Sequence, residues 1–371
     1  MSLKTTNTNE HREKIQLEAL KKLEKKSKAG LDISMGVGKT YIGLRYLESS
    51  IGLFDKVLVV APKRSIFESW KTDAEKFNLS HILDKIVFTT YISLIKHNPL
   101  DYSIVVLDEA HNAKNSHRPF LENFKGRILG LTGTPPKWES SEAGQMMQEF
   151  YPIVYSYQVD DAVSSGILND YRIFIHPLYL NSANTIKTKQ GWYTSEVKNY
   201  DYLTRRIEDS EGKSKFMATI MRLNAMKQFK SKESYVEKCL NLIKPQDKCL
   251  IFANTTEQAE RVCSNFYHSK NSKEENNKNL EDFKNGTITR LSAVEQLSEG
   301  ITIPDLKHII IMHAYGNEKK ASQKIGRALR LNPNQTSTIH ILMYKDTVDT
   351  KWVYQSLEGF DLDKIKISNI K

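Results

Sequence analysis

The stretch Ser34-Met35-Gly36-Val37-Gly38-Lys39-Thr40 (SMGVGKT) lies between a short apolar run and a segment of helical periodicity that starts near Tyr41. Its two glycines let backbone N–H groups approach a phosphate, and the N-terminus of the following helix faces the phosphate charge. We therefore expect a loop in which Lys39 reaches the β- and γ-phosphates of ATP and Thr40 ligates Mg²⁺. The loop residues expected to bind the nucleotide are Met35, Gly36, Val37, Gly38, Lys39 and Thr40.

A pair of adjacent carboxylates supports this interpretation. The loop alone leaves a glycine-rich turn before a helix as the alternative, because the general pattern has glycine where this chain has Ile33. Asp108 and Glu109 follow the apolar run Ile104-Val105-Val106-Leu107, and two carboxylates at a strand end are costly without a cation. Asp108 is expected to hold Mg²⁺ through water, and Glu109 to orient and polarise the attacking water. An acidic helix cap would explain Asp108 alone.

Apolar runs without alternation predict strands that are buried on both faces of a parallel sheet. Helical segments separate these runs in both halves of the chain, which predicts two doubly wound α/β domains with sites at the carboxyl ends of the strands. Strands are expected at 57–60, 86–88, 104–107, 128–131, 172–180, 249–252, 289–292, 308–312 and 338–342, and helices at 15–23, 65–77, 216–243, 257–267 and 319–329. The polar segment 269–279 is expected to be a solvated loop or helix end.

The domains implied by this pattern are an N-terminal ATP-binding domain at 1–168 and a C-terminal domain at 169–371. A linker or helical insertion is expected at about 170–246. No nuclease carboxylate cluster, zinc module or large accessory domain is visible in the sequence.

Composition narrows the class of protein. The chain has 371 residues, 39% of them hydrophobic and 26% charged, which is typical of globular domains. Apolar runs are too short to span a membrane, and residues 1–14 do not have the pattern of a secretory signal. The three cysteines have no metal-site or disulfide spacing and suit a reducing compartment. A net charge of +10 favours a nucleic-acid partner, and an intracellular location in the cytoplasm or nucleoid is expected, or the host cytoplasm if the source is viral.

Taken in order along the chain, these motifs and several others resemble those of superfamily 2 helicases and translocases. The resemblance covers nearly the whole chain and implies two RecA-like domains in tandem with the ATP site between them. The matching segments are Gln16, Ser34–Thr40 (motif I), Val60–Lys63 (Ia), Thr89–Leu94 (Ib), Asp108–His111 (II), Leu131–Pro135 (III), Cys249–Asn254 (IV), Glu299–Pro304 (V) and Gln323–Arg330 (VI).

The resemblance also implies roles for individual residues. Arg327 and Arg330, three apart on one helical face, are expected to reach the γ-phosphate as arginine fingers in cis, and Gln323 is expected among the catalytic residues. Gln16 and Gly300 are implied to contact the nucleotide, and Gln16 resembles an adenine-recognising glutamine. Coupling of the sites is implied for His111, Thr132 and Thr134, and nucleic-acid contact for Pro62, Lys63, Thr90, Thr255 and Ser292. Thr90 and Ser292 could equally well satisfy strand ends. Trp70 and Phe77 are expected in the core.

The amino-acid sequences of the motifs most resemble those of DNA motors of the phage UvsW type and the Swi/Snf type. The leading hypothesis is therefore an ATP-dependent DNA helicase or translocase, with a monomeric core, that moves on or remodels duplex or branched DNA in replication, recombination or repair. Three alternatives remain open: an RNA helicase, a translocase that does not unwind duplex DNA, and a nucleic-acid-binding scaffold without turnover. In a scaffold without turnover, we would expect other residues in place of Lys39, Glu109 or Arg330. All three residues are present.

Overall fold

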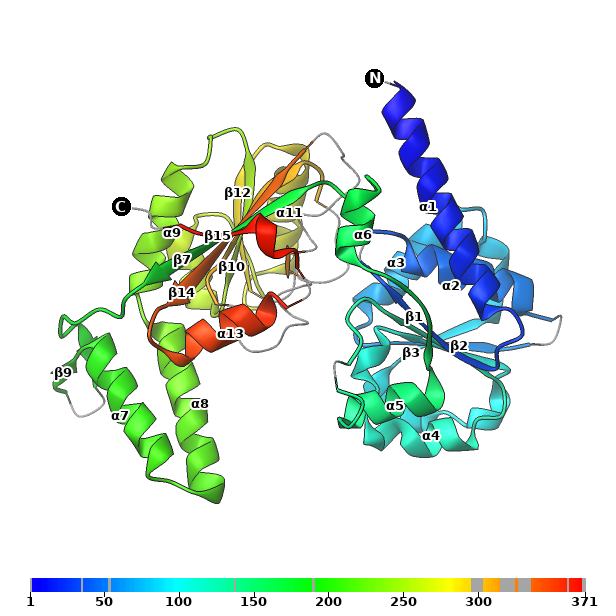
Figure 1. Cartoon of the computed structure of the whole chain (residues 1–371), viewed down its shortest axis with the longest axis horizontal. Helices are drawn as coiled ribbons and strands as arrows, with labels where there is room; N and C mark the ends of the chain where they lie inside the picture. The colour runs from blue at the N-terminus through cyan, green and yellow to red at the C-terminus, as the bar shows by residue number, and fades with distance from the viewer. Residues whose placement is uncertain are drawn as a thin grey trace. The chain divides into compact units, whose positions relative to one another are not determined.

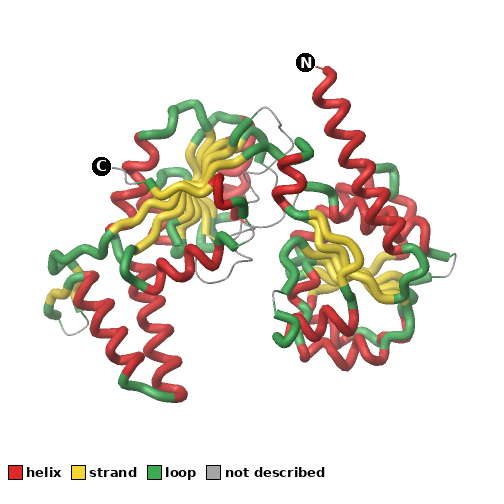
Figure 2. Tube along the Cα trace, in the orientation of Figure 1, coloured by secondary structure: helices red, strands yellow, loops and turns green. Residues whose placement is uncertain are grey.

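A computed structural model describes residues 2–34, 36–52, 55–136, 138–188, 191–294, 303–313, 324–325, 335–358 and 360–368. These residues fall into two compact units, one up to Asp170 and one from Tyr171 onward. Each unit is an α/β domain built on its own parallel sheet, as Figure 2 shows. The expectation of two RecA-like, doubly wound domains is thereby confirmed.

The sheet of unit 1 has six strands in the order β3-β2-β4-β5-β1-β6, all parallel. Its inner strands are uninterrupted apolar runs because both of their faces are covered: β2 and β4 are buried at every position. The strands are β1 (Lys28–Ile33), β2 (Val57–Ala61), β3 (Ile86–Thr90), β4 (Ile104–Asp108), β5 (Arg127–Thr132) and β6 (Ile153–Tyr157).

Helices cover both faces of this sheet, as Figure 1 shows, with α4 and α5 on one side and α2 and α3 on the other. The helices of unit 1 are α1 (Ser2–Leu23), α2 (Lys39–Ser50), α3 (Ser65–Lys76), α4 (Arg118–Asn123), α5 (Glu142–Phe150) and α6 (Val159–Ser164). Short 3₁₀ turns lie at Ser80–Lys85, Tyr91–Lys96, Pro99–Asp101, Ala110–Asn112 and Asn115–His117.

The sheet of unit 2 has seven strands in the order β11-β12-β10-β13-β14-β7-β15, again all parallel. Its strands are β7 (Tyr171–Leu178), β10 (Lys248–Ala253), β11 (Phe266–Tyr267), β12 (Arg290–Val294), β13 (Leu306–Ile311), β14 (Ser337–Tyr344) and β15 (Ile365–Ile367). A separate antiparallel pair, β8 (Ile186–Lys187) and β9 (Tyr193–Thr194), follows β7.

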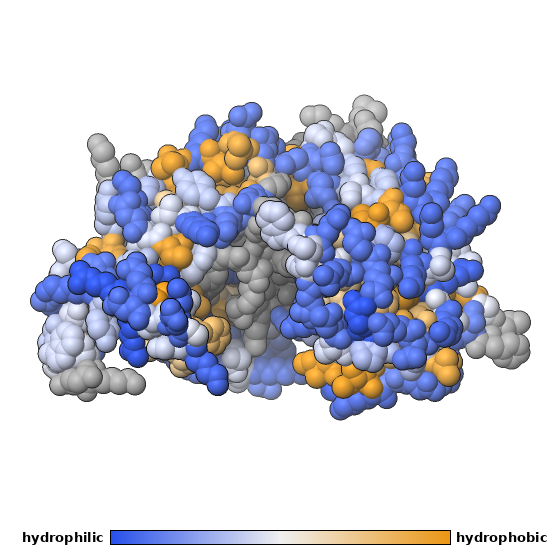
Figure 3. Space-filling view, turned by 60° about the horizontal axis from the view of Figure 1, so that its bottom comes forward, coloured by the Kyte–Doolittle hydropathy of each residue, from blue (hydrophilic) through white to orange (hydrophobic). Residues whose placement is uncertain are grey.

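Two of the helices in unit 2, α7 and α8, pack against each other as a hairpin that extends away from the sheet in Figure 1. The helices are α7 (Glu196–Glu208), α8 (Gly212–Gln228), α9 (Ser231–Asn241), α10 (Thr256–Val262), α11 (Lys273–Asn285) and α13 (Val348–Ser356), and a 3₁₀ turn lies at Leu362–Lys364. The face of the molecule drawn in Figure 3 is mainly hydrophilic, with separate apolar patches.

Several boundaries differ from the sequence-based expectations. The helix expected at 257–267 ends at Val262, because the chain turns there to add β11 to the sheet. The helix expected at 216–243 is two helices, which separate at Phe229, a residue with extended backbone angles and a buried side chain. The segment 269–279 enters α11, whose N-terminus is capped by the Ser272 hydroxyl.

The range 170–246, expected as a linker or insertion, has two parts. Its first residues form β7, which lies inside the sheet between β14 and β15. The β8–β9 pair, the α7–α8 hairpin and α9 lie outside that sheet. Among the residues that the structure describes, no helix is long and apolar enough to cross a membrane.

Candidate nucleotide-binding site

The loop between β1 and α2 has the backbone of a phosphate cradle. Gly36 has φ 86° and Gly38 has φ 107°, a left-handed conformation that favours glycine. A Cβ atom on Gly38 would lie 2.7 Å from the Gln16 amide nitrogen, so any other residue would displace that side chain in addition to straining the backbone. The Lys39 ammonium donates a hydrogen bond to the carbonyl of Ile33 at 3.0 Å, which holds it over the loop.

Helix α1 is fastened to this loop by two side chains. Gln16 donates to the Val37 carbonyl at 2.7 Å, and the Arg12 Nε donates to the same oxygen at 3.0 Å. Burial lowers the pKa of Arg12, with Asp73 opposing the shift. Sequence reasoning missed Arg12. Its position four residues before Gln16, on the same face of a helix, was the available signal.

The two carboxylates of motif II stand at the carboxyl end of β4. Asp108 is 7% exposed, and one of its oxygens accepts from the Glu109 N–H at 2.9 Å. The other oxygen accepts from the Trp70 indole at 2.8 Å. Burial raises the pKa of Asp108, while the bond from Trp70 and the charge of Lys39 oppose the shift.

Trp70 is fully buried, as expected, but its role goes beyond packing because it orients the motif II aspartate. The sequence carries no signal for this contact, since the partners are 38 residues apart. Phe77, also expected in the core, is only partly buried and packs on Tyr41 with ring centroids 4.5 Å apart.

The donor set suits Mg²⁺. Each Asp108 oxygen accepts one N–H in the contacts above and has further lone pairs, and its charge is desolvated. Thr40 supplies a hydroxyl on the first turn of α2, directly after Lys39. A carboxylate and a hydroxyl beside phosphates are the hard oxygen ligands that Mg²⁺ prefers.

Motifs II and III are joined through one histidine. The Nδ1 atom of His111 lies 3.0 Å from the Thr132 hydroxyl and 3.2 Å from the Thr134 hydroxyl. It also lies 3.5 Å from a Glu109 carboxylate oxygen. A Cβ on Gly133, between the two threonines, would lie 2.8 Å from the Lys39 ammonium. The three residues expected to couple the sites therefore form one cluster with Glu109, next to Lys39.

Strand order explains how this cluster forms. β4, β5 and β1 are neighbours, and Asp108 pairs with Leu131 while Asp32 pairs with Thr132. The carboxyl ends of these strands therefore meet at one edge. Asp32 lies at that edge, is 3% exposed, and receives a hydrogen bond from the Gln158 amide. Burial raises its pKa. Sequence reasoning missed Asp32, although an acidic residue within a buried run was a visible signal.

Three of the residues expected to contact nucleic acid lie together on unit 1. Pro62 and Lys63 follow β2, and Lys63 is exposed. Thr90 ends β3 and pairs with Ala61. Its hydroxyl lies 3.4 Å from that of Ser93, and its side chain is partly exposed.

The two expected contact residues of unit 2 differ from each other. Thr255 caps α10 by accepting from the Gln258 N–H, and its side chain is partly exposed. Ser292 is fully buried and donates to the Ala259 carbonyl at 2.8 Å. Ser292 therefore fastens α10 to β12, and it is not among the groups that we propose for nucleic-acid contact.

Five expected site residues lie outside the described residues: Met35, Gly300, Gln323, Arg327 and Arg330. Their roles remain predictions.

Unit 2 also contains a buried group that could hold a metal ion, made of His176, Cys239 and His340. The two histidines are hydrogen-bonded to each other at 3.0 Å, and the other nitrogen of His176 bonds the Ser368 carbonyl at 3.0 Å. This chain of hydrogen bonds accounts for their spacing without a metal.

The fold and the loop together define a nucleotide-binding protein with two RecA-like domains. Residues 6–137 match the family described as type III restriction enzyme, res subunit, and residues 231–332 match the helicase conserved C-terminal domain. The chain belongs to superfamily 2 of helicases and translocases, a class of nucleic-acid-dependent, ATP-hydrolysing enzymes. The closer resemblance to UvsW-type and Swi/Snf-type motors stays a prediction.

Curated relatives agree with this assignment. The DNA 3'-5' translocase XPB2 of Sulfurisphaera tokodaii is 24% identical over 374 residues, which cover 90% of this chain and 82% of the relative. The uncharacterized ATP-dependent helicase YqhH of Bacillus subtilis is also 24% identical, over 96% of this chain and 82% of its own.

Solved structures share the fold. The type ISP restriction-modification enzyme LlaBIII bound to DNA superposes with a TM-score of 0.64 at 15% identity and covers 97% of this chain. The chain spans only 31% of that protein and 48% of the helicase Lhr of Mycobacterium smegmatis. The Hef helicase domain of Pyrococcus furiosus gives a TM-score of 0.56 at 15% identity, over 94% of this chain and 98% of that one.

Proposed function

We propose that this protein is a DNA motor: an ATP-dependent helicase or translocase that moves on or remodels duplex or branched DNA in replication, recombination or repair. The observation that carries the proposal is the cluster at the edge of the unit 1 sheet. There, a phosphate-binding loop, a desolvated Asp108 and the bonded His111-Thr132-Thr134 group lie together. This cluster has the parts required to bind ATP and to connect hydrolysis to a second site.

In the proposed mechanism, Gly36 and Gly38 present backbone N–H groups to the phosphates and Lys39 neutralises their charge. Asp108 and Thr40 would hold Mg²⁺, which supplies charge neutralisation on the phosphates when it is bound. Glu109 orients and polarises the attacking water as a general base.

Coupling to nucleic acid is proposed to run through His111. This side chain touches Glu109 and both motif III threonines, so a change at the γ-phosphate can alter hydrogen bonds in motif III. Arg327 and Arg330 are proposed to reach the γ-phosphate from unit 2, so that ATP binding draws the two units together and product release lets them part.

DNA is the favoured partner, and the chain's own contacts are proposed at Pro62, Lys63, Thr90 and Thr255. The support is the similarity to a protein named as a DNA translocase and to a restriction enzyme solved with DNA. The net charge of +10 fits backbone contacts that do not depend on base sequence. A location inside the cell with DNA, and action as a monomeric core, belong to the same proposal.

The decisive experiment is the rate of ATP hydrolysis by the full chain with duplex DNA, forked DNA, single-stranded DNA and RNA at a fixed salt concentration. We expect stimulation by DNA, with duplex or forked DNA giving the largest effect. A fork-regression assay then separates remodelling from simple translocation. Stimulation by RNA alone would contradict the proposal and favour an RNA helicase.

A further inference from the structure

A second site lies in unit 2, on the face of the sheet that α13 covers. It is an open cavity of about 820 Å³ at the carboxyl ends of β7 and β14. A cavity of this volume is large enough for a drug-sized ligand. The residues described above for ATP and nucleic acid do not line it.

The cavity lies next to the last residue of an edge strand. β15 ends at Ile367, which pairs with Ile175 on β7. Two residues further along β7, on the same face, lies Pro177, paired with Met343 of β14. β15 has no residue paired with Pro177, and Ile367 itself is 63% exposed. The floor formed by Pro177, Met343 and Ile367 is therefore apolar; Met343 is buried and Ile367 is exposed.

The rim carries aromatic rings and positive charge. Tyr179 is 66% exposed and Tyr354 is 49% exposed, although both are large rings beside an apolar floor. The Lys345 ammonium donates to the Tyr179 hydroxyl at 3.0 Å and lies 5.3 Å from the ring centroid. Lys351 adds a second ammonium, and Asp346 adds one carboxylate. Two rings for stacking and two cations near them match a base and its phosphate.

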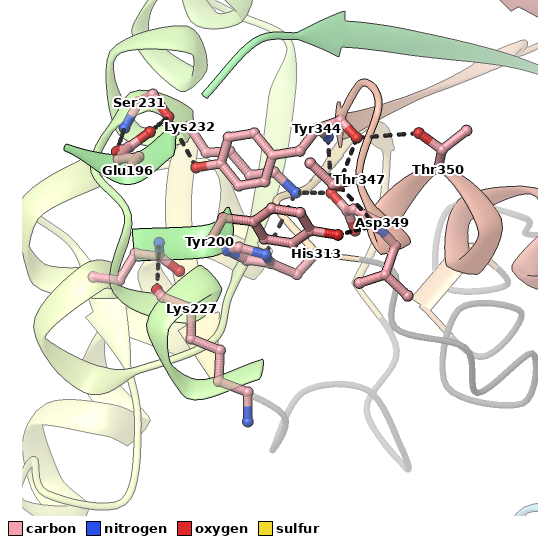
Figure 4. Close-up of polar contacts among 12 residues, drawn as sticks. Glu196, Tyr200, Lys227, Ser231, Lys232, His313, Tyr344, Thr347, Asp349 and Thr350 are labelled. Atoms are coloured by element: carbon pink, nitrogen blue, oxygen red, sulfur yellow. Dashed lines mark hydrogen bonds and ion pairs between the residues drawn. The ribbon is translucent and has the colours of Figure 1, made fainter. Parts of the chain in front are cut away.

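Polar contacts behind the rim join the end of β14 to the start of α13, as Figure 4 shows. Asp349 at the start of α13 is 1% exposed and accepts from the Lys232 ammonium at 2.6 Å and from the Tyr344 N–H at 2.9 Å. The hydroxyls of Thr347 and Thr350 both donate to the Tyr344 carbonyl. The turn from β14 into α13 is thus fixed, and a preformed wall lowers the entropy that a ligand loses on binding.

The site also lies on the sheet edge already proposed for nucleic acid. Thr255 follows β10, and β10, β13, β14 and β7 are parallel neighbours, so their carboxyl ends share one edge. With strands about 4.8 Å apart, β7 is about 14 Å from β10. A strand that contacts Thr255 could reach the cavity within a few nucleotides.

We propose that this cavity binds an unpaired nucleotide of a DNA strand, with the base between Tyr179 and Tyr354 and the backbone phosphate at Lys345 and Lys351. The inference rests on the proposed function, since it assumes that DNA is the partner. It adds a contact to single-stranded DNA to the duplex or branched DNA of the proposed function.

The test uses the full chain and a single-stranded oligonucleotide that carries 2-aminopurine, whose fluorescence is quenched on stacking. Wild type should quench it, and Tyr354→Ala or Tyr179→Ala should weaken binding by about 5- to 100-fold and restore the fluorescence. Lys345→Ala should lower the slope of log affinity against log salt by about one. Tyr202→Ala, which removes a 61% exposed tyrosine on α7, is the matched control and should behave as wild type.

A second measurement locates the contact. Photocrosslinking with 5-iodouracil oligonucleotides should modify Tyr179 or Tyr354. Crosslinks elsewhere, together with wild-type affinity in both tyrosine variants, would overturn the inference and favour a peptide as the occupant. DNA-stimulated ATP hydrolysis is recorded in parallel. If it is intact while the variants bind normally, only this inference fails, whereas wild type that neither binds DNA nor responds to it refutes the proposed function as well.

Discussion

Lys39 and Glu109 have different roles in the proposed mechanism, so their substitutions should have different effects. Lys39→Ala removes the charge that neutralises the phosphates and should abolish both ATP binding and hydrolysis. Glu109→Gln keeps the shape of the side chain but not its basicity, and should abolish hydrolysis while ATP still binds. Binding is measured with a fluorescent ATP analogue and turnover by phosphate release. Normal turnover in both variants would refute the assigned roles.

Trp70 offers a sharper test, because its indole N–H donates to one oxygen of the buried Asp108. Trp70→Phe leaves a desolvated carboxylate oxygen without its donor, which costs about 1–3 kcal/mol. It should also raise the pKa of Asp108 further, since a bond to the ionised form is lost. We therefore expect a lower melting temperature and a higher Mg²⁺ concentration for half-maximal ATP hydrolysis, most clearly at low pH.

The matched control for this variant is Trp192→Phe, at a tryptophan that is 58% exposed. It should change neither the melting temperature nor the Mg²⁺ concentration for half-maximal ATP hydrolysis. An unchanged Mg²⁺ requirement in Trp70→Phe would show that the indole only fills space.

At the scale of elements, helix α9 is joined to α13 by a buried ion pair. The Lys232 and Asp349 side chains are 0% and 1% exposed. Removing one partner of such a pair leaves an uncompensated buried charge, which costs about 3–5 kcal/mol. Lys232→Met should therefore destabilise unit 2 by about that amount, and Lys232→Met with Asp349→Asn by clearly less. Urea unfolding measures both.

An exposed pair in the same unit provides the comparison. Lys270 and Glu257 form an ion pair with side chains 66% and 56% exposed. Lys270→Met should cost less than about 1 kcal/mol because water screens the charges. Equal losses in Lys232→Met and Lys270→Met would contradict a role for burial.

A buried histidine beside Lys232, His313, makes unit 2 sensitive to acid. Burial lowers the pKa of His313 well below 6.5, and the charges of Lys232, Lys324 and Lys227 lower it further. The native state therefore keeps His313 neutral where the unfolded chain would protonate it. Stability from this residue is complete above about pH 6.5 and is lost as the pH falls below that value, by up to about 1.4 kcal/mol per pH unit.

His313→Gln should consequently flatten the dependence of the unfolding free energy on pH between 7 and 4, measured by urea titration at each pH. His81→Gln, at a histidine that is 62% exposed, is the control and should leave the slope unchanged. A wild-type slope in His313→Gln would show that other groups carry the acid sensitivity.

Elements differ in how far the sequence predicts them. β2, β4 and β10 were predictable because strands buried on both faces are unbroken apolar runs. β11 and β15 have two and three residues, too few for any periodicity, and they exist because a neighbouring strand offers an edge. β7 was expected as a strand, but its place in the sheet depends on β14, which lies far along the chain.

The candidate site divides in the same way. Lys39, Asp108 and His111 each lie in a motif that is a continuous stretch of sequence, and they were expected from the sequence. The side chains that support them, Trp70 and Arg12, come from distant segments and make contacts that only the fold creates. Local sequence patterns therefore indicate the catalytic and binding residues. The residues that orient these side chains are brought to them by tertiary packing.

At the scale of the whole molecule, the motor proposal requires both units. Arg327→Ala or Arg330→Ala should leave ATP binding intact and reduce stimulated turnover on the order of a thousandfold, as expected of arginine fingers in cis. Turnover near the wild-type rate in both arginine variants would mean that unit 1 hydrolyses ATP without help from unit 2.

The position of β7 has a consequence for how the chain is made. β7 is the first strand of unit 2 to leave the ribosome, yet its partners β14 and β15 are among the last, and its His176 meets His340 164 residues later. Until then, β7 is an unpaired apolar strand, open to wrong partners. Slow synthesis or premature termination before β14 should therefore promote aggregation, and chaperones that mask extended apolar segments should raise the yield of folded protein.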